Sequence, residues 1–492
     1  MTPSTTRTVA VVGGGIAGLA AAWELSEGPG PGARVIVFEG ESRFGGKLRT
    51  ETFGGQDVDL GPDAFVARRP EALTLCTELG LATDLVAPEA RRAYVWARGH
   101  LRLLPAGLAL GVPTRFGPLA RSGICSPAGL VRPALDLLRP ALGSAPVSAP
   151  DADRSVGDIV RRRLGREVAS RLAGPLIGGI HAGTVESMSA AAVFPALLTA
   201  DRRPGSLMRA LRNDGPPTPP VTGADGGAAP PIFLSVRGGL GRLVDELTRA
   251  LADRGVELRD HSPVDAIGRA AGGGGRRWAI RTDGEQCDAD GIVVAVPAPA
   301  AAGLLRPLDA ALADGLDAVS YASVVLVTMR FAEDAVPHPL DGSGFLVPRE
   351  SGRDPGPLVT ACTWLSSKWP ELRRDGELLL RVSVGRDGDV RHATLDDDAL
   401  VERCVAELGV MMGVRGSPVE TLVTRWPSAF PQYQVGHPAR VAAIESAAAR
   451  LPSCALAGAA LHGVGIPACI GSGRRAGRAV LDGIGAASGA AP

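Results

Sequence analysis

The pattern of apolar and polar positions at the start of the chain predicts a strand, a helix and a second strand. Thr8–Val12 (TVAVV) is an apolar run rich in β-branched residues that ends at glycine, as a short buried strand does. Residues 16–26 (IAGLAAAWELS) are mostly strong helix formers, and residues 34–39 (RVIVFE) repeat the strand pattern. Strands that alternate with helices are typical of a parallel sheet in an α/β protein.

Further patterns of both kinds follow along the chain. Leucine and valine side chains between residues 240 and 251 fall on one face of a helix, and a strand is predicted directly after it at 256–259. Other helices are predicted at 70–80, 155–180 and 396–412 and from about Pro467 onward, and other strands at 277–282, 290–297, 324–331, 344–347 and 377–384, the last three as an antiparallel sheet.

These elements predict an α/β fold in which a Rossmann-type nucleotide-binding domain is interrupted by two other domains. The loop at 213–231 is rich in Pro and Gly, and we expect it to be disordered because it cannot offset its ordering entropy. The predicted boundaries are 1–90, 232–300 and 436–492 for the nucleotide-binding domain, 91–212 for a helical cap and 301–435 for a mixed-sheet domain.

A glycine motif follows the first predicted strand. Gly13, Gly15 and Gly18 have the spacing G-x-G-x-x-G, which allows a tight turn, close approach of a pyrophosphate and close packing of helix on sheet. Glu39 ends the second strand and is suited to bind ribose hydroxyls; the GPGPG insert at 28–32 explains its longer spacing from the motif. The motif alone is weak in a chain with 65 glycines, but strand, turn, helix, strand and acid in this order predict a dinucleotide site.

The segment 41–50 (ESRFGGKLRT) follows the second predicted strand. Gly45 and Gly46 again allow close backbone approach, and Lys47 places a cation beside them. Because this lysine comes just after the ribose acid, we favour a phosphate or flavin contact over a solvated loop position.

Composition and charge exclude several classes of function. The 52 Lys and Arg residues balance 52 Asp and Glu residues, so we expect no nucleic-acid partner. No apolar run reaches about 18 residues, and MTPSTTR leads directly into the first strand, so we expect neither a transmembrane helix nor a signal peptide. The seven cysteines show no metal-binding spacing, and we expect reduced thiols, no metal site and a cytoplasmic location.

In combination, the motifs resemble those of the flavin-dependent amine oxidase superfold. Within it, the chain looks most like the porphyrinogen oxidases of haem synthesis, which act on protoporphyrinogen or coproporphyrinogen III. The resemblance covers nearly the whole chain apart from the Pro- and Gly-rich loops. Its more specific motifs are GPDAF at 61–65, PLIGGIHAG at 175–183, PQYQVGH at 431–437 and GVGIPACI at 463–470.

The resemblance implies a Rossmann-type FAD-binding domain interrupted by a mixed-sheet substrate domain and a helical cap domain. FAD is expected to be non-covalent, because the stretch 425–433 (RWPSAFPQY) contains no cysteine. Gly13–Gly18 would hold the pyrophosphate, Glu39 the ribose and Val264 the adenine end. The full set of implied cofactor-binding residues is Gly13, Gly14, Gly15, Ile16, Ala17, Gly18, Glu39, Gly40, Lys47, Gly61, Pro62, Asp63, Ala64, Val264, Trp426, Val464, Gly465 and Ile466.

The activity implied is a six-electron aromatisation of a porphyrinogen with O2 as the final acceptor. We expect coproporphyrinogen III as substrate, with protoporphyrinogen IX as the alternative. Arg68 and Arg69 are candidates for binding its propionates, although solvated surface arginines are an equal alternative. We assign no catalytic residue, and His181 and His437 are expected to be structural. The cap is a candidate for peripheral membrane contact, and the product for transient transfer to a downstream haem-synthesis enzyme.

Three other functions have to be weighed. Amine oxidases of this superfold use a lysine in a strand of the substrate sheet, but the run 320–331 has none, and Lys47 and Lys368 are the only lysines in the chain. Carotenoid desaturases share the glycine motif without PQYQVGH. Prenyl-protein escort and dissociation-inhibitor proteins have this fold without flavin, and the colour of the purified protein distinguishes them.

Overall fold

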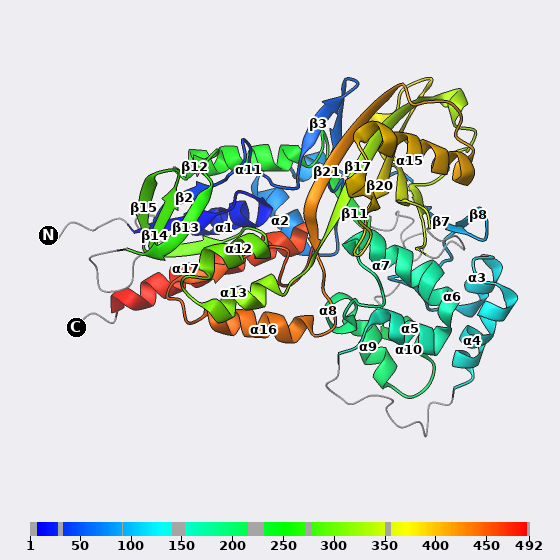
Figure 1. The fold of residues 1–492 in the computed structure, drawn as a ribbon, viewed down its shortest axis with the longest axis horizontal. Helices are drawn as coiled ribbons and strands as arrows, with labels where there is room; N and C mark the ends of the chain where they lie inside the picture. Colours follow the sequence, from blue (N-terminus) through cyan, green and yellow to red (C-terminus); the bar gives the residue numbers. More distant parts are fainter. Residues whose placement is uncertain are drawn as a thin grey trace. The chain divides into compact units, whose positions relative to one another are not determined.

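The computed structural model describes residues 7–27, 33–90, 92–139, 153–214, 231–270, 278–349 and 356–489, and the described chain forms two compact units (Figure 1). The GPGPG insert and nearly all of the predicted loop at 213–231 lie outside the described residues. Unit 1 consists of residues 1–87, 231–320 and 439–492, and unit 2 of residues 88–230 and 321–438.

A parallel sheet forms the centre of unit 1. Its strand order is β12-β2-β1-β16-β22, and Val9 on the central strand pairs with Val35 on one side and Gly291 on the other. All three segments of the unit contribute strands, which confirms the Rossmann-type sheet. The bounds are β1 Thr8–Val12, β2 Arg34–Phe38, β12 Glu257–Arg259, β16 Gly291–Val294 and β22 Cys454–Leu456.

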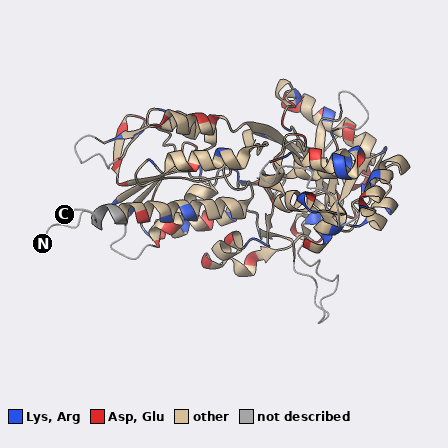
Figure 2. Ribbon diagram, turned by 90° about the horizontal axis from the view of Figure 1, so that it is seen from below, with Lys and Arg blue, Asp and Glu red and all other residues tan. Residues whose placement is uncertain are grey.

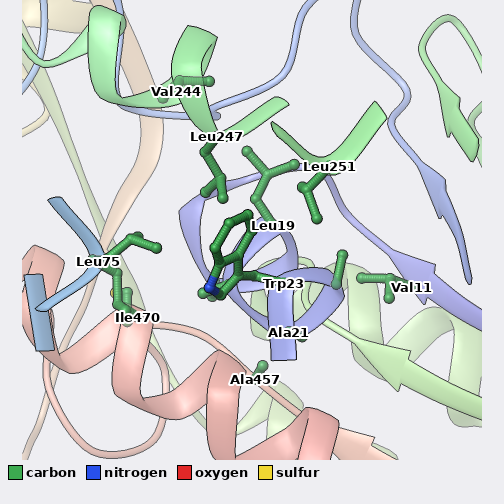
Figure 3. Packing of buried hydrophobic residues seen from close by; sticks show 14 of the residues in the cluster. Val11, Leu19, Ala21, Trp23, Leu75, Val244, Leu247, Leu251, Ala457 and Ile470 are labelled. Carbon is green, nitrogen blue, oxygen red and sulfur yellow. The ribbon is translucent and has the colours of Figure 1, made fainter. Parts of the chain in front are cut away.

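The helices α1 (Ile16–Ser26), α11 (Gly241–Asp253) and α17 (Ile466–Gly489) bury the main core of unit 1. Figure 3 shows Trp23 of α1 among side chains of α11 and α17. The remaining elements of this unit are β3 Thr50–Phe53, β4 Gln56–Asp59, β5 Phe65–Val66, α2 Pro70–Glu78, η1 Ala82–Asp84, β6 Leu85–Val86, β11 Phe233–Val236, β13 Val264–Arg269, β14 Trp278–Thr282, β15 Glu285–Ala289, α12 Ala298–Leu305, α13 Ala310–Asp317 and α16 His437–Ala448, whose first two residues fall in unit 2.

Unit 2 contains a seven-stranded mixed sheet of order β21-β17-β20-β19-β18-β7-β8. Its neighbouring strands are antiparallel except for the β18–β7 pair. The helix α15 (Asp397–Met412) packs on it through Leu400, Cys404 and Leu408. The bounds are β7 Tyr94–Ala97, β8 His100–Leu103, β17 Tyr321–Ala332, β18 Gly344–Leu346, β19 Val359–Trp364, β20 Glu377–Val384 and β21 Glu420–Pro431.

Short helices make up most of the rest of unit 2. Within the described residues, no helix is both long and apolar enough to cross a membrane. Figure 2 shows basic and acidic residues interspersed along the described chain. The elements are β9 Leu108–Ala109, β10 Val112–Pro113, α3 Phe116–Arg121, α4 Pro127–Leu137, α5 Val156–Leu164, α6 Arg166–Val168, η2 Ala169–Ala173, α7 Gly174–His181, α8 Ala190–Val193, α9 Pro195–Arg202, α10 Leu207–Asp214, η3 Glu333–Ala335, α14 Leu365–Lys368, η4 Pro370–Leu372 and η5 Arg391–Thr394.

The structure differs from the sequence-based expectations in one predicted helix and in the domain boundaries, where residues 88–90 and 436–438 fall in unit 2 and not with the nucleotide-binding segments. The helix predicted at 155–180 is not continuous, because Gly165 adopts φ +91° and ends α5. The predicted cap and mixed-sheet domains fall in one unit, and residues 301–320, which we expected in the mixed-sheet domain, belong to unit 1 with α12 and α13.

Candidate functional site

The turn between β1 and α1 is built by glycines that have no room for a side chain. Gly13 has φ +106°, and its N–H donates to the Phe38 carbonyl at 2.8 Å. A Cβ on Gly18 would lie 1.9 Å from the Gly13 carbonyl oxygen. The turn and the start of α1 therefore pack as closely as the sequence predicts.

Gly15 differs from these two glycines because the space beside it is open. It caps α1 with φ −69° and ψ 172°, which any residue can adopt, and among the described residues no side chain caps the free N–H groups of the first turn. A Cβ on Gly15 would have no described protein atom within 4 Å. Free N–H groups, the helix dipole and this open space fit a pyrophosphate.

Glu39 lies where β2 ends, next to the glycine turn. Its Oε2 accepts the Gly14 N–H at 2.8 Å and its Oε1 accepts the Glu41 N–H at 2.9 Å. The Ser262 N–H donates to the Glu39 carbonyl at 2.7 Å, which places the start of β13, and with it Val264, near Gly40. Since a carboxylate has about four acceptor positions, Glu39 keeps capacity for ribose hydroxyls.

Replacing Glu39 by alanine is expected to weaken binding of the nucleotide cofactor by roughly 1.5–3 kcal/mol, the value of a hydrogen bond to a charged group. The measurement is titration of the deflavinated protein with FAD. Glu41→Ala is the matched control, because it removes an exposed carboxylate two residues away. Equal dissociation constants for both variants and the natural protein would contradict the placement of the ribose.

The segment 43–48 is held against the glycine turn. The Gly45 N–H donates to the Gly14 carbonyl at 2.8 Å. Arg43 fixes the loop by donating to the carbonyls of Phe44 at 2.9 Å and Leu48 at 3.0 Å, and its burial lowers the pKa of this guanidinium. We did not predict this role for Arg43; the only sequence signal was an arginine directly before the FGG turn, able to donate to several carbonyls.

Lys47 is a desolvated cation near the start of α17. Burial lowers its pKa, and within the described part of the chain its side chain has no hydrogen-bond or ion-pair partner. Burial also raises the pKa of Cys469 on α17 to about 11, against the attraction of Lys47 and Arg69. A partly buried ammonium that lacks a partner among the described residues fits an anionic or polar cofactor atom.

The loop 61–64 leads into β5, which packs against α17. A Cβ on Gly463 would lie 3.9 Å from the Arg69 guanidinium, so this arginine is close to the loop 463–466. However, Arg69 is already paired with Glu71 at 3.0 Å, and Arg68 is exposed. Unit 1 thus contains every predicted cofactor residue except Trp426, but neither arginine has the features of a buried carboxylate site.

Trp426 belongs to unit 2, where it lies on β21 opposite Val324 of β17. It packs with Phe430 against a small apolar cluster that includes Ala182 and Val324. Its contact with an isoalloxazine ring stays a prediction. In the described residues, no group of three or more His, Cys, Asp or Glu side chains could hold a metal.

His181 is held neutral by its surroundings. Burial lowers its pKa to about 4, whereas the unfolded chain takes up this proton below about pH 6.5. Its contribution to stability is therefore present above pH 6.5 and is lost as the pH falls toward 4. Between these limits, we expect the unfolding free energy of the natural protein to fall more steeply than that of His181→Asn, by up to about 1.4 kcal/mol per pH unit. Urea unfolding at about pH 5 and 6 measures the slopes; parallel slopes would contradict this.

Comparison with known proteins gives full-length matches. The model of a family described as flavin containing amine oxidoreductase matches residues 16–481. A coproporphyrinogen III oxidase of Propionibacterium freudenreichii subsp. freudenreichii is 36% identical, over 98% of this chain and 92% of the relative. A protoporphyrinogen oxidase of Bos taurus is 31% identical, over 96% and 98%. A solved Exiguobacterium sp. 255-15 protein, provisionally named a protoporphyrinogen oxidase, superposes with TM-score 0.83 and 29% identity, over 97% and 99% of the two chains.

Proposed function

The chain belongs to the flavin-containing amine oxidoreductase family, and from this we propose that it oxidises coproporphyrinogen III to coproporphyrin III with FAD and O2. The observation that carries the proposal is the full-length similarity to a coproporphyrinogen III oxidase at 36% identity. The cofactor site supports it independently, because the glycine turn, Glu39 and Lys47 have the geometry and charge that a flavin nucleotide needs.

When bound, FAD supplies the two-electron acceptor for each oxidation and passes the electrons to O2, which leaves as peroxide. The residues of this chain bind and orient. The N-terminus of α1 and Glu39 would hold the pyrophosphate and ribose, while Lys47 and the N-terminus of α17 would present positive charge to the ring system. We assign no side chain as catalytic base, and the substrate N–H protons leave to water.

The proposal is tested by product stoichiometry with the holoenzyme. Six electrons removed in two-electron steps require three O2 consumed and three H2O2 formed per coproporphyrin III. An oxygen electrode, a peroxide assay and porphyrin fluorescence measure the three quantities together. Coproporphyrin formation no faster than in a blank without enzyme would refute the proposal.

Protoporphyrinogen IX oxidation is the second candidate, and the similarity to the Bos taurus enzyme favours keeping it. An amine oxidase is disfavoured because the whole of β17 (Tyr321–Ala332) lacks lysine. A flavin-free escort protein is disfavoured by the open, cationic cofactor site, and a yellow purified protein would exclude it.

We also propose that the protein works in the cytoplasm and touches membranes peripherally. All seven cysteines are free thiols, as expected in a reducing compartment. On α4, Val131 and Leu135 are 55% and 50% exposed, and Leu138 just beyond the helix is 78% exposed, which gives one apolar stripe. Co-sedimentation with anionic lipid vesicles tests whether this stripe contacts membranes. Leu135→Ser should reduce vesicle binding. Absence of vesicle binding by the natural protein would contradict the proposed membrane contact.

A further inference from the structure

Arg386 lies in a tight turn directly after β20, and neighbouring elements fix this turn. The Asp389 N–H donates to the Arg386 carbonyl at 2.9 Å, which closes the turn. A Cβ on Gly385 would lie 2.6 Å from the Ser323 carbonyl oxygen, so the backbone packs directly on β17. On its other side, the Asp387 N–H donates to the carbonyl of Ala182 at the end of α7 at 2.6 Å.

The guanidinium of Arg386 is largely desolvated, yet no described residue forms a hydrogen bond or ion pair with it. Burial lowers its pKa to about 10, and within the described residues its side chain makes no hydrogen bond or ion pair. The nearby carboxylate of Asp389 is bound by both arms of Arg391, at 2.8 and 2.6 Å. A partly buried cation without a partner is costly, and a bound anion would offset that cost.

A second cation is available beside the turn. Arg349 is exposed, and one of its nitrogens donates to the Asp387 carbonyl at 3.3 Å. Another lies 3.7 Å from where a Cβ on Gly388 would be. Two guanidinium groups next to one short turn favour a carboxylate, which each of them can bind in a bidentate manner.

The turn is also linked, through Ala182, to the cluster that contains Trp426, the one residue of unit 2 expected near the flavin ring. Ala182, which accepts the hydrogen bond from Asp387, belongs to the same apolar cluster as Trp426 and Phe430. The carbonyl of His181, one residue earlier, accepts a hydrogen bond from Gln432 at 2.9 Å. Within unit 2, the turn, the end of α7 and the PQYQVGH segment therefore form one continuous region.

We propose that Arg386, assisted by Arg349, binds a propionate carboxylate of the porphyrinogen, an inference that rests on the proposed function. Arg386 would then bind the propionate for which the sequence suggested Arg68 and Arg69. Those two arginines are exposed, and one is already neutralised by Glu71, whereas Arg386 is desolvated and unpaired in the described residues.

The test compares Arg386→Met with Arg415→Met in the holoenzyme. Arg415 is an exposed arginine of the same unit whose side chain forms no hydrogen bond or ion pair with the described residues, so this control removes the same charge. We expect Arg386→Met to raise KM for coproporphyrinogen III roughly tenfold to hundredfold with little change in kcat. Arg386→Lys should recover part of the loss, and Arg415→Met should behave as the natural protein.

FAD content and the urea midpoint are measured for each variant. Unchanged KM in Arg386→Met would overturn the inference, and so would a lowered urea midpoint, because the arginine would then be structural. If the natural protein itself does not oxidise coproporphyrinogen III, the proposed function fails instead. If the natural protein is fully active and Arg386→Met has the same KM, only the role of Arg386 is refuted.

Discussion

Replacing Gly15 by alanine is expected to leave the fold intact and to weaken FAD binding at least roughly hundredfold, which corresponds to one or two lost charged hydrogen bonds. The backbone of Gly15 suits any residue, and a Cβ there would meet no described protein atom within 4 Å. The added methyl group would fill the space in which we place the pyrophosphate, and it would push this group away from the N–H groups of α1.

Gly18→Ala is the matched comparison, because it lies on the same helix but in closed packing. Its Cβ would lie 1.9 Å from the Gly13 carbonyl oxygen, so the protein itself should be destabilised, by about 1–3 kcal/mol or more. Urea unfolding and FAD titration of both deflavinated variants separate the effects. A Gly15→Ala protein that binds FAD normally would contradict the site, and a Gly18→Ala protein of full stability would contradict the packing.

Arg163→Met is expected to destabilise unit 2 by about 3–5 kcal/mol, because it leaves the buried carboxylate of Asp136 without its cation. Asp201 keeps Arg162 and Arg154 as ion-pair partners. Arg163 is buried on α5 and bonds Asp136 of α4 at 3.0 Å and Asp201 of α9 at 3.3 Å. It also donates to the Gly205 carbonyl at 2.6 Å. One guanidinium thus joins three helices.

The measurement is the urea midpoint, with Arg161→Met on the same helix as control. Arg161 pairs with Glu186 at 2.9 Å, but both side chains are about half exposed, so less than about 1 kcal/mol should be lost. Equal destabilisation by the two variants would show that burial does not determine how much each ion pair contributes to the free energy of unfolding.

Local sequence patterns predicted much of the cofactor unit. The β-branched strand, the glycine turn and the helix former at 16–26 are local signals, and α1 has the predicted bounds. Asp396 caps α15 by accepting the Ala399 N–H at 2.8 Å, which agrees with the helix predicted at 396–412. Where the signals for an element lie within its own residues, the sequence was sufficient to predict that element.

Features that depend on distant residues were not predicted. The strands β19 and β21 carry mixed polar and aromatic residues, and their place is set by pairing with β20 and β17. In the sequence, nothing distinguishes Arg386 from an exposed arginine after a strand. Its desolvation arises from the packing of its turn on β17 and α7. The same holds for Arg163, whose partners are 27 and 38 residues away.

The most direct test of the proposed function is the ratio of kcat/KM for coproporphyrinogen III to that for protoporphyrinogen IX, measured on the FAD-loaded protein by porphyrin fluorescence. Four propionates offer more carboxylates than two to the cationic groups of the chain, and the first relative described above acts on coproporphyrinogen III by its name. We expect a ratio above about ten, which one charged hydrogen bond can supply. A ratio below one would contradict the proposal and identify protoporphyrinogen IX as the preferred substrate.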